Sequence, residues 1–166
     1  MSTEVAYNEY AAKAIEQLNK GAFLTTRDGD KLNTMTIGWG SIGFIWRKPV
    51  FMAMVRPSRY TYGIIEKSNE FTVSIPFNDM KQELALCGAK SGRSVDKFKA
   101  AGLSTNPGKK IATPVIADCG LHYECKVIFK QAMAPAQLEA EYQASCYPNG
   151  DYHIMYYGEI MATYID

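Results

Sequence analysis

The chain has 166 residues, of which 47% are hydrophobic and 21% are charged. A domain of this size buries roughly 70% of the surface of its unfolded chain, which excludes a disordered or collagen-like protein. The 18 basic and 17 acidic residues leave a formal net charge of +1, so we expect no nucleic-acid partner and no anionic membrane partner. Any bound anion should be small and held locally.

The ends and the cysteines point to a cytoplasmic protein. The first ten residues carry acids where a signal peptide would carry a basic segment and an apolar run. No segment approaches the roughly 20 apolar residues of a membrane span. The four cysteines form no CxxC pair, which favours reduced thiols in the core over a disulfide framework.

The first predicted element is a helix over about residues 8–20. One apolar stripe runs along it, made of Ala11, Ala14, Ile15 and Leu18. Gly21 follows where a C-terminal cap belongs.

The rest of the chain predicts more strands than helices. Strands are predicted at 22–26, 32–39, 50–55, 70–75, 115–117, 121–129 and 153–164, with a hairpin turn at 27–30. Short helices are predicted at 59–68, 81–87, 94–101 and 137–144. Because these helices do not alternate one for one with strands, we expect a mainly β fold, an antiparallel sheet or barrel with peripheral helices. Nothing resembles a linker, so residues 1–166 are predicted to form one domain, with the barrel over about 22–164.

Gly38, Gly40 and Gly43 form a GxGxxG pattern. A dinucleotide-binding fold needs a helix that begins at the third glycine, but Pro49 would stop such a helix within two turns. Two hypotheses remain: the glycines let backbone amides approach a flat ligand, or they mark a pair of bulges in a strand.

The charge pattern indicates two positive regions. The 35 residues between Asp30 and Glu66 contain no acid, where the composition predicts about four, and 84–95 contain none either. Within the first, Ser58 is predicted to cap a helix whose first turn holds Arg59 and Thr61, with Arg56 just outside. Basic residues at a helix N-terminus are unfavourable unless an anion is bound, so this segment indicates a phosphate site. Residues 90–94 (KSGRS) have similar chemistry, with Ser94 as the predicted cap of the next helix; a solvated basic face is the alternative.

Cys119, His122 and Cys125 invite comparison with a metal site. If the strand predicted at 121–129 reaches back to Cys119, the histidine faces away from both cysteines, which then lie ~20 Å apart. We therefore expect structural cysteines and no metal.

Several blocks together resemble the flavin reductase-like, flavoredoxin-type family of FMN-binding split barrels. They are NTMTIGWG (33–40), RPSRYTYG (56–63), EFTVSI (70–75), SGRSVDKF (91–98), His153 and GEI (158–160). The resemblance covers about residues 23–160. It implies an antiparallel split β-barrel and a homodimer with noncovalent FMN at the subunit interface.

Carried over by position, the resemblance implies these FMN contacts: Asn33, Thr34, Met35, Thr36, Trp39 and Gly40 along the flavin ring; Arg56, Ser58, Arg59 and Thr61 at the phosphate; Ser91, Gly92 and Arg93 at the phosphate and ribityl chain; and His153 near the flavin. A core position for Trp39 is the alternative. Two features depart from the family pattern. Tyr152 separates Asp151 from His153, and the segment 132–149 is longer than expected.

The resemblance implies an NAD(P)H-dependent, flavin reductase-type oxidoreductase that passes electrons to a small-molecule or protein acceptor. No separate nicotinamide motif is present, so the donor comes from the resemblance alone. An electron carrier without NAD(P)H turnover, or a noncatalytic flavin-binding module, are the alternatives.

Overall fold

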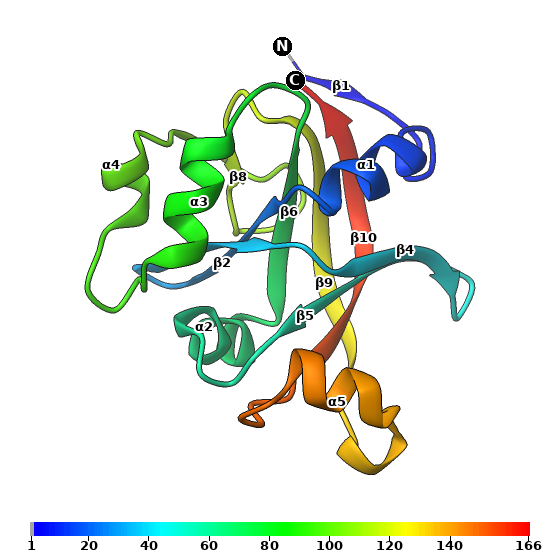
Figure 1. Cartoon of the computed structure of the whole chain (residues 1–166). Helices are drawn as coiled ribbons and strands as arrows, with labels where there is room; N and C mark the ends of the chain where they lie inside the picture. Colours follow the sequence, from blue (N-terminus) through cyan, green and yellow to red (C-terminus); the bar gives the residue numbers. More distant parts are fainter. Residues whose placement is uncertain (1) are drawn as a thin grey trace.

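A single antiparallel sheet organises the molecule. The computed structural model describes residues 2–166, and in it seven strands pair in the order β3-β2-β6-β9-β10-β5-β4 (Figure 1). Their bounds are β2 (Ala22–Asp28), β3 (Lys31–Ile37), β4 (Gly40–Ile45), β5 (Lys48–Val55), β6 (Glu70–Pro76), β9 (Gly120–Ala132) and β10 (Ile154–Ile165). The short β1 (Thr3–Glu4) pairs with the end of β10, while β7 (Thr105–Asn106) and β8 (Val115–Ile116) form a separate pair. The predicted mainly β, antiparallel fold is confirmed.

The two edge strands of this sheet are neighbours in the sequence, and this closes the barrel. Only Gly38 and Trp39 separate β3 from β4. Three Cα steps reach at most about 11 Å, so the two edges must lie close together there. No ladder pairs β3 with β4 in the described residues, so the barrel is split along this line.

The predicted strand at 32–39 was too long, because it ends at Ile37, and strand β4 was not predicted. The ladder between β4 and β5 pairs Gly40 and Gly43 without a register shift, so no bulge lies at either of these two glycines. A Cβ on Gly40 would lie 3.0 Å from the carbonyl oxygen of Met52 and 3.1 Å from the ring of Phe51. Close packing is therefore what this glycine permits.

The turn between β4 and β5 explains why the hairpin was missed. Its two residues, Trp46 and Arg47, both have left-handed backbones, with φ of 53° and 59°. This two-residue turn normally carries Asn or Gly. A sequence pattern without either residue gives no hairpin signal.

The main core fills the barrel, and a second cluster lies beside it. The largest fully buried side chains of the main core include Phe51, Phe71, Tyr123 and Tyr156. The second cluster joins Phe23 to Leu84, Cys87, Ile116 and Cys119.

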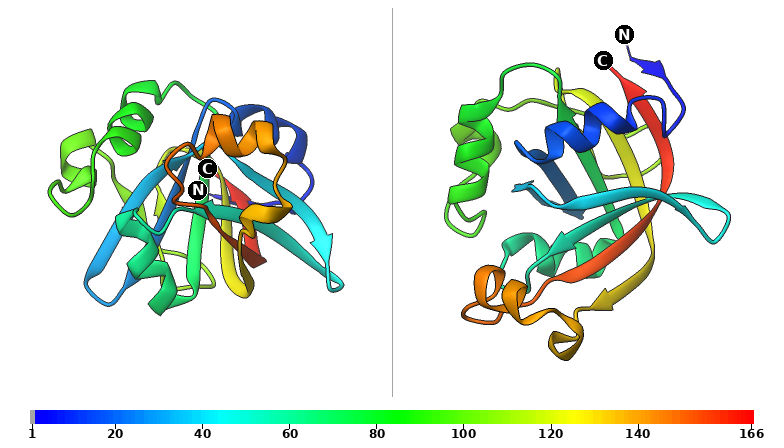
Figure 2. Two further views of the ribbon diagram at one scale, coloured as in Figure 1. Left: turned by 60° about the horizontal axis from the view of Figure 1, so that its bottom comes forward. Right: turned by 45° about the vertical axis from the view of Figure 1, so that its right-hand side comes forward.

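Helices surround the barrel (Figures 1 and 2). They are α1 (Ala11–Leu18), α2 (Tyr60–Ser68), α3 (Lys81–Ala89), α4 (Lys97–Ala101), the 3-10 turn η1 (Pro135–Gln137) and α5 (Ala140–Cys146). α3 packs against β3 and β2, whereas α5 lies at the end of the barrel remote from both termini. No helix in residues 2–166 has both the length and the apolar character needed to cross a membrane.

Both predicted N-terminal helix caps were wrong, and α1 ends with Asn19 rather than Gly21 as its C-terminal cap. The residue before α2 is Arg59, not Ser58, and the residue before α4 is Asp96, whose carboxylate accepts the N–H of Lys99. Ser94 instead donates weakly to the carbonyl of Ser91 within the loop. The helices predicted at 8–20 and 137–144 both begin three residues later than predicted, the second because the turn at Pro135 precedes it.

Cys119, His122 and Cys125 have separate surroundings. β9 begins only at Gly120, so strand alternation does not extend to Cys119, which joins the second cluster. His122 is fully buried, and its ring nitrogens contact the Ser74 hydroxyl at 3.0 Å and the Asp166 carboxylate at 2.8 Å. Cys125 belongs to the main core, where burial raises the pKa of its thiol. Each cysteine is thus packed in a separate apolar cluster, and the histidine is held by its own hydrogen bonds.

Candidate functional site

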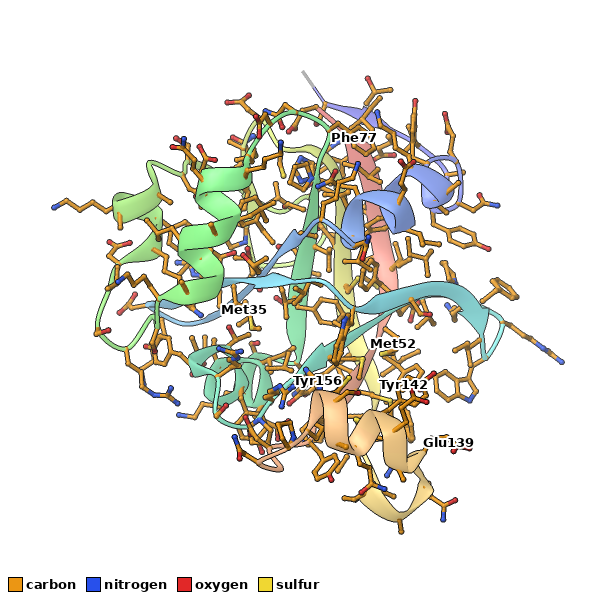
Figure 3. All side chains as sticks on the ribbon, in the orientation of Figure 1. Met35, Met52, Phe77, Glu139, Tyr142 and Tyr156 are labelled. Atoms are coloured by element: carbon orange, nitrogen blue, oxygen red, sulfur yellow. The ribbon has the colours of Figure 1, made fainter. Side chains whose placement is uncertain are left out.

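Two adjoining cavities lie where β3, the start of α2, the loop after α3 and the end of β5 meet. Each has a volume of about 170 Å³. They share Met35, Thr36 and Arg59, and so form one cleft. Figure 3 shows Met35 between the end of α3 and α2, at this junction.

One part of the cleft, here called the charged end, is lined by basic and hydroxyl-bearing residues. The sequence-predicted residues that line it are Asn33, Met35, Thr36, Ser58, Arg59, Thr61, Ser91, Gly92 and Arg93. Lys90 and Lys97 line it too, and no lining residue is an Asp or Glu. Four cations without an acid make a strong site for a small anion.

Lys97 is the residue that sequence reasoning missed here. Its side chain is buried, and its ammonium donates to the carbonyl oxygens of Thr34 at 2.9 Å and Cys87 at 2.8 Å. Burial lowers the pKa of this amine, and the nearby Arg59 lowers it further. Lys97 lies within the block 91–98, but nothing in the sequence distinguishes it from a solvent-exposed lysine. Its burial is visible only in the folded structure.

Gly92 and Asn33 show how tightly the loop after α3 packs against β3. A Cβ on Gly92 would overlap the amide oxygen of Asn33 and lie 2.6 Å from Cδ1 of Tyr60. Asn33 in turn donates from Nδ2 to the Thr61 hydroxyl at 2.9 Å. The loop, β3 and the first turn of α2 therefore form one closely packed wall.

Two predicted positions face away from the cleft. The Thr34 side chain is fully buried and accepts a hydrogen bond from the Thr25 hydroxyl at 3.0 Å, so it belongs to the β2–β3 ladder. Gly40 packs against β5. Neither lines the charged end or the other cavity.

Arg56 and Ser58 are engaged by the segment before β10. Arg56 donates to the carbonyl oxygens of Cys146 at 2.9 Å and Asp151 at 3.2 Å. The Ser58 hydroxyl and N–H donate to the Asp151 carboxylate at 2.5 and 3.2 Å. Asp151 therefore accepts hydrogen bonds from Arg56 and Ser58, two residues that were predicted to bind phosphate. The cations that line the charged end are Arg59, Arg93, Lys90 and Lys97.

The other part of the cleft, here called the aromatic end, combines Trp39, Met54 and His153 with Arg56 and Arg59. The Trp39 side chain is 46% exposed, so it is not a core residue. Its ring centroid lies 5.3 Å from that of His153 and 6.5 Å from that of Tyr147.

The electrostatics of the aromatic end keep His153 neutral. Burial, Arg56 and Arg59 together lower the pKa of His153 to about 4, against a smaller opposing effect of Asp151. At neutral pH this imidazole therefore offers one N–H donor and one acceptor nitrogen.

Comparison with known proteins identifies the family. The sequence pattern of the flavin reductase like domain matches residues 19–166. An uncharacterized protein of Pyrococcus abyssi is 31% identical over 100 residues, a match that spans 60% of this chain and 56% of that protein.

Two solved structures share the architecture. The flavoredoxin of Desulfovibrio vulgaris (Miyazaki F) superposes with a TM-score of 0.69 at 26% identity, covering 88% of this chain and 69% of that one. The FMN-binding domain of a flavin reductases-like enzyme from Shewanella baltica superposes with a TM-score of 0.71 at 20% identity. The match covers 100% of this chain and 78% of that one, and it supports the fold. The predicted split-barrel fold is confirmed.

Proposed function

We propose that this chain, which belongs to the flavin reductase-like family, binds FMN noncovalently as a redox cofactor. One observation carries the proposal: a cleft with four cations, several hydroxyls and no acid at one end, and aromatic and methionine side chains at the other. FMN has one phosphate and one large flat ring, so it matches both ends. The likeness to a flavoredoxin supports a flavin cofactor.

In this proposal the charged end holds the phosphate. Arg59, Arg93 and Lys97 supply charge, and the hydroxyls of Thr61 and Ser91 supply further donors. Asn33, Met35 and Thr36 of β3 lie along the ring, which reaches Trp39 and His153 at the aromatic end. Bound FMN would supply one- and two-electron transfer, while the protein determines its seating, polarity and access.

We further propose that NADH or NADPH reduces this flavin and that a small molecule or a protein receives the electrons. The family supports this reaction class, since its members include a flavin reductase with the same fold. The second candidate is an electron carrier without its own NAD(P)H turnover, which the flavoredoxin likeness favours.

A homodimer is part of the proposal. Trp46 in the turn between β4 and β5, Phe129 of β9 and Tyr157 of β10 form an aromatic cluster with ring centroids 5.4–6.0 Å apart. The side chains of Trp46 and Phe129 are 55% and 42% exposed. Phe44 adds a 62% exposed ring on the same hairpin as Trp46. Such an exposed apolar surface supports self-association, which light scattering at micromolar concentration would test.

A cytoplasmic location is also proposed. All four cysteines, which lie in the described part of the chain, are free, and three of them are buried. Free thiols suit a reducing compartment.

The decisive experiment begins with the absorption spectrum of the purified protein, followed by reconstitution with FMN and with riboflavin. FMN should bind more tightly than riboflavin and be released on denaturation. Anaerobic addition of NADH or NADPH should then bleach the flavin absorbance. Binding without bleaching would favour the electron carrier, whereas a protein that binds neither flavin would overturn the proposal.

A further inference from the structure

The segment between β9 and β10 places one buried side chain against His153, which lines the cleft. No residue of α5 is buried, and Tyr142 on this helix is 53% exposed (Figure 3). Tyr147, directly after α5, is only 5% exposed. The segment that departs from the family pattern is therefore anchored through this tyrosine.

The Tyr147 side chain is fixed on several sides. Its ring stacks on Tyr152 at 4.7 Å with an interplanar angle of 20°, and the Arg56 guanidinium lies 4.7 Å from its centroid. Its hydroxyl lies 2.5 Å from Nδ1 of His153 and 3.2 Å from the sulfur of Met133. Because Arg56 also donates to the carbonyl of Cys146, the end of α5 and the ring are held together.

Both members of the Tyr147–His153 pair are neutral near pH 7. Burial raises the pKa of Tyr147, against the effect of Arg56. The groups that face His153 are Arg56, Arg59 and Asp151, besides Tyr147. Burial, Arg56 and Arg59 lower the pKa of His153 to about 4, although the Asp151 carboxylate acts in the opposite direction. The contact between these two neutral groups is a hydrogen bond that uses one proton, carried either by the Tyr147 hydroxyl or by Nδ1 of His153.

Two acceptors lie within donor distance of the Tyr147 hydroxyl, the Met133 sulfur and Nδ1 of His153, and their acceptor strengths indicate which one receives its proton. Because an imidazole nitrogen accepts a hydrogen bond far better than a thioether sulfur does, we infer that the hydroxyl donates to Nδ1. The imidazole proton must then be on Nε2. No hydrogen bond to Nε2 is present among residues 2–166, and His153 lines the aromatic end of the cleft.

We propose that Tyr147 is a positioning residue that holds His153 as the Nε2–H tautomer and so gives the aromatic end a neutral hydrogen-bond donor for a carbonyl or amide oxygen. This rests on the proposed function for its ligand, which would lie against the flavin. It gives the segment between β9 and β10 a role in selecting the molecule that enters beside the ring. A ligand that offers only donors to Nε2 would be disfavoured.

The tautomer can be tested on the apo protein, without flavin. In ¹⁵N-histidine NMR spectra, wild-type Nδ1 of His153 should be unprotonated and Nε2 protonated. Tyr147→Phe keeps the ring but removes the donor, so the tautomers should mix and the pKa of His153 should rise, because a hydrogen bond to the neutral form is lost. Tyr152→Phe removes a neighbouring hydroxyl that makes no hydrogen bond in the described chain and should change neither. A proton on Nδ1 in the wild type, or equal spectra for Tyr147→Phe and wild type, would overturn the positioning role.

The donor role is tested on the FMN-loaded protein with nicotinamide as a carboxamide probe. The Nε2–H resonance should shift on titration, and binding should weaken about fivefold in Tyr147→Phe but not in Tyr152→Phe. Nicotinamide that binds without moving this resonance, or that does not bind, would overturn the donor role. If the protein takes up no flavin, the proposed function fails, while the apo spectra still decide the role of Tyr147.

Discussion

The charged end of the cleft is lined only by residues between 33 and 97, whereas the aromatic end joins Trp39 to His153 near the end of the chain. At the charged end, hydrogen bonds and charge fix the geometry: Asn33 holds Thr61, and Lys97 holds two carbonyl oxygens. At the aromatic end, ring contacts among Trp39, Tyr147 and His153 do so. The comparison indicates that one end recognises charge and the other recognises a flat surface. Variants at the two ends should therefore affect FMN and riboflavin differently.

The largest effect is expected for Lys97→Met. A buried charge is weakly screened, and a charge-assisted hydrogen bond to phosphate contributes up to about 3 kcal/mol, so FMN affinity should fall about 100-fold. Riboflavin, which lacks the phosphate, should lose much less. Quenching of flavin fluorescence measures both affinities.

Lys99→Met is the matched control, because Lys99 is exposed on the same short helix. Thermal unfolding of the apo protein distinguishes a structural role of Lys97 from a role in binding. In Lys97→Met the Thr34 and Cys87 carbonyls lose their donor, which should lower the free energy of unfolding by about 1–3 kcal/mol. Lower apo stability with an unchanged ratio of FMN to riboflavin affinity would assign Lys97 to the fold alone.

Arg59→Ala should weaken FMN about tenfold and leave riboflavin nearly unchanged. The effect is smaller than for Lys97 because Arg59 is exposed and its charge is better screened. Arg27→Ala, an exposed arginine on the β2–β3 hairpin, is the control. Equal losses for the two flavins would contradict the placement of phosphate at the charged end.

Trp39→Ala should weaken FMN and riboflavin equally, by about 1 kcal/mol or about fivefold, since a flat packing surface is lost at the aromatic end. Trp39→Phe keeps such a surface and should retain most of the affinity. Because Trp39 is 46% exposed, the melting temperature of the apo Trp39→Ala variant should change little. A selective loss of FMN would show that the comparison between the two ends is wrong.

A further prediction concerns pH and the aromatic end. The folded-state pKa of His153 is about 4, below the ordinary value of 6.5. Between these values the unfolded chain takes up a proton that the folded chain does not, so the free energy of unfolding should fall as pH drops from about 6.5 to about 4. Urea unfolding at pH 7 and pH 4.5 measures this change.

His153→Gln should make the unfolding free energy less dependent on pH in this window. His122 also has a lowered pKa through burial, so His122→Asn is needed to separate the two histidines. The same pH dependence in wild type and His153→Gln would contradict a neutral His153 at the aromatic end.

Much of the charged end could be predicted from the sequence, because its parts lie close together along the chain. The acid-free stretch after Asp30 and the KSGRS loop indicated an anion site, and both contribute to the wall that Asn33, Thr61 and Gly92 form. Lys97 escaped this reasoning, since only burial distinguishes it from the exposed Lys99.

The sequence by itself determined the mainly β class, most strands, and the concentration of positive charge, because strand periodicity and charge spacing are local properties. The hairpin of β4 and β5 depended on left-handed backbones at Trp46 and Arg47, which local preference does not favour and tertiary packing imposes. Only the closure of the barrel through Gly38 and Trp39 brought Trp39, Tyr147 and His153 together. Contacts between residues so far apart in sequence follow from the strand order, and no local pattern encodes that order.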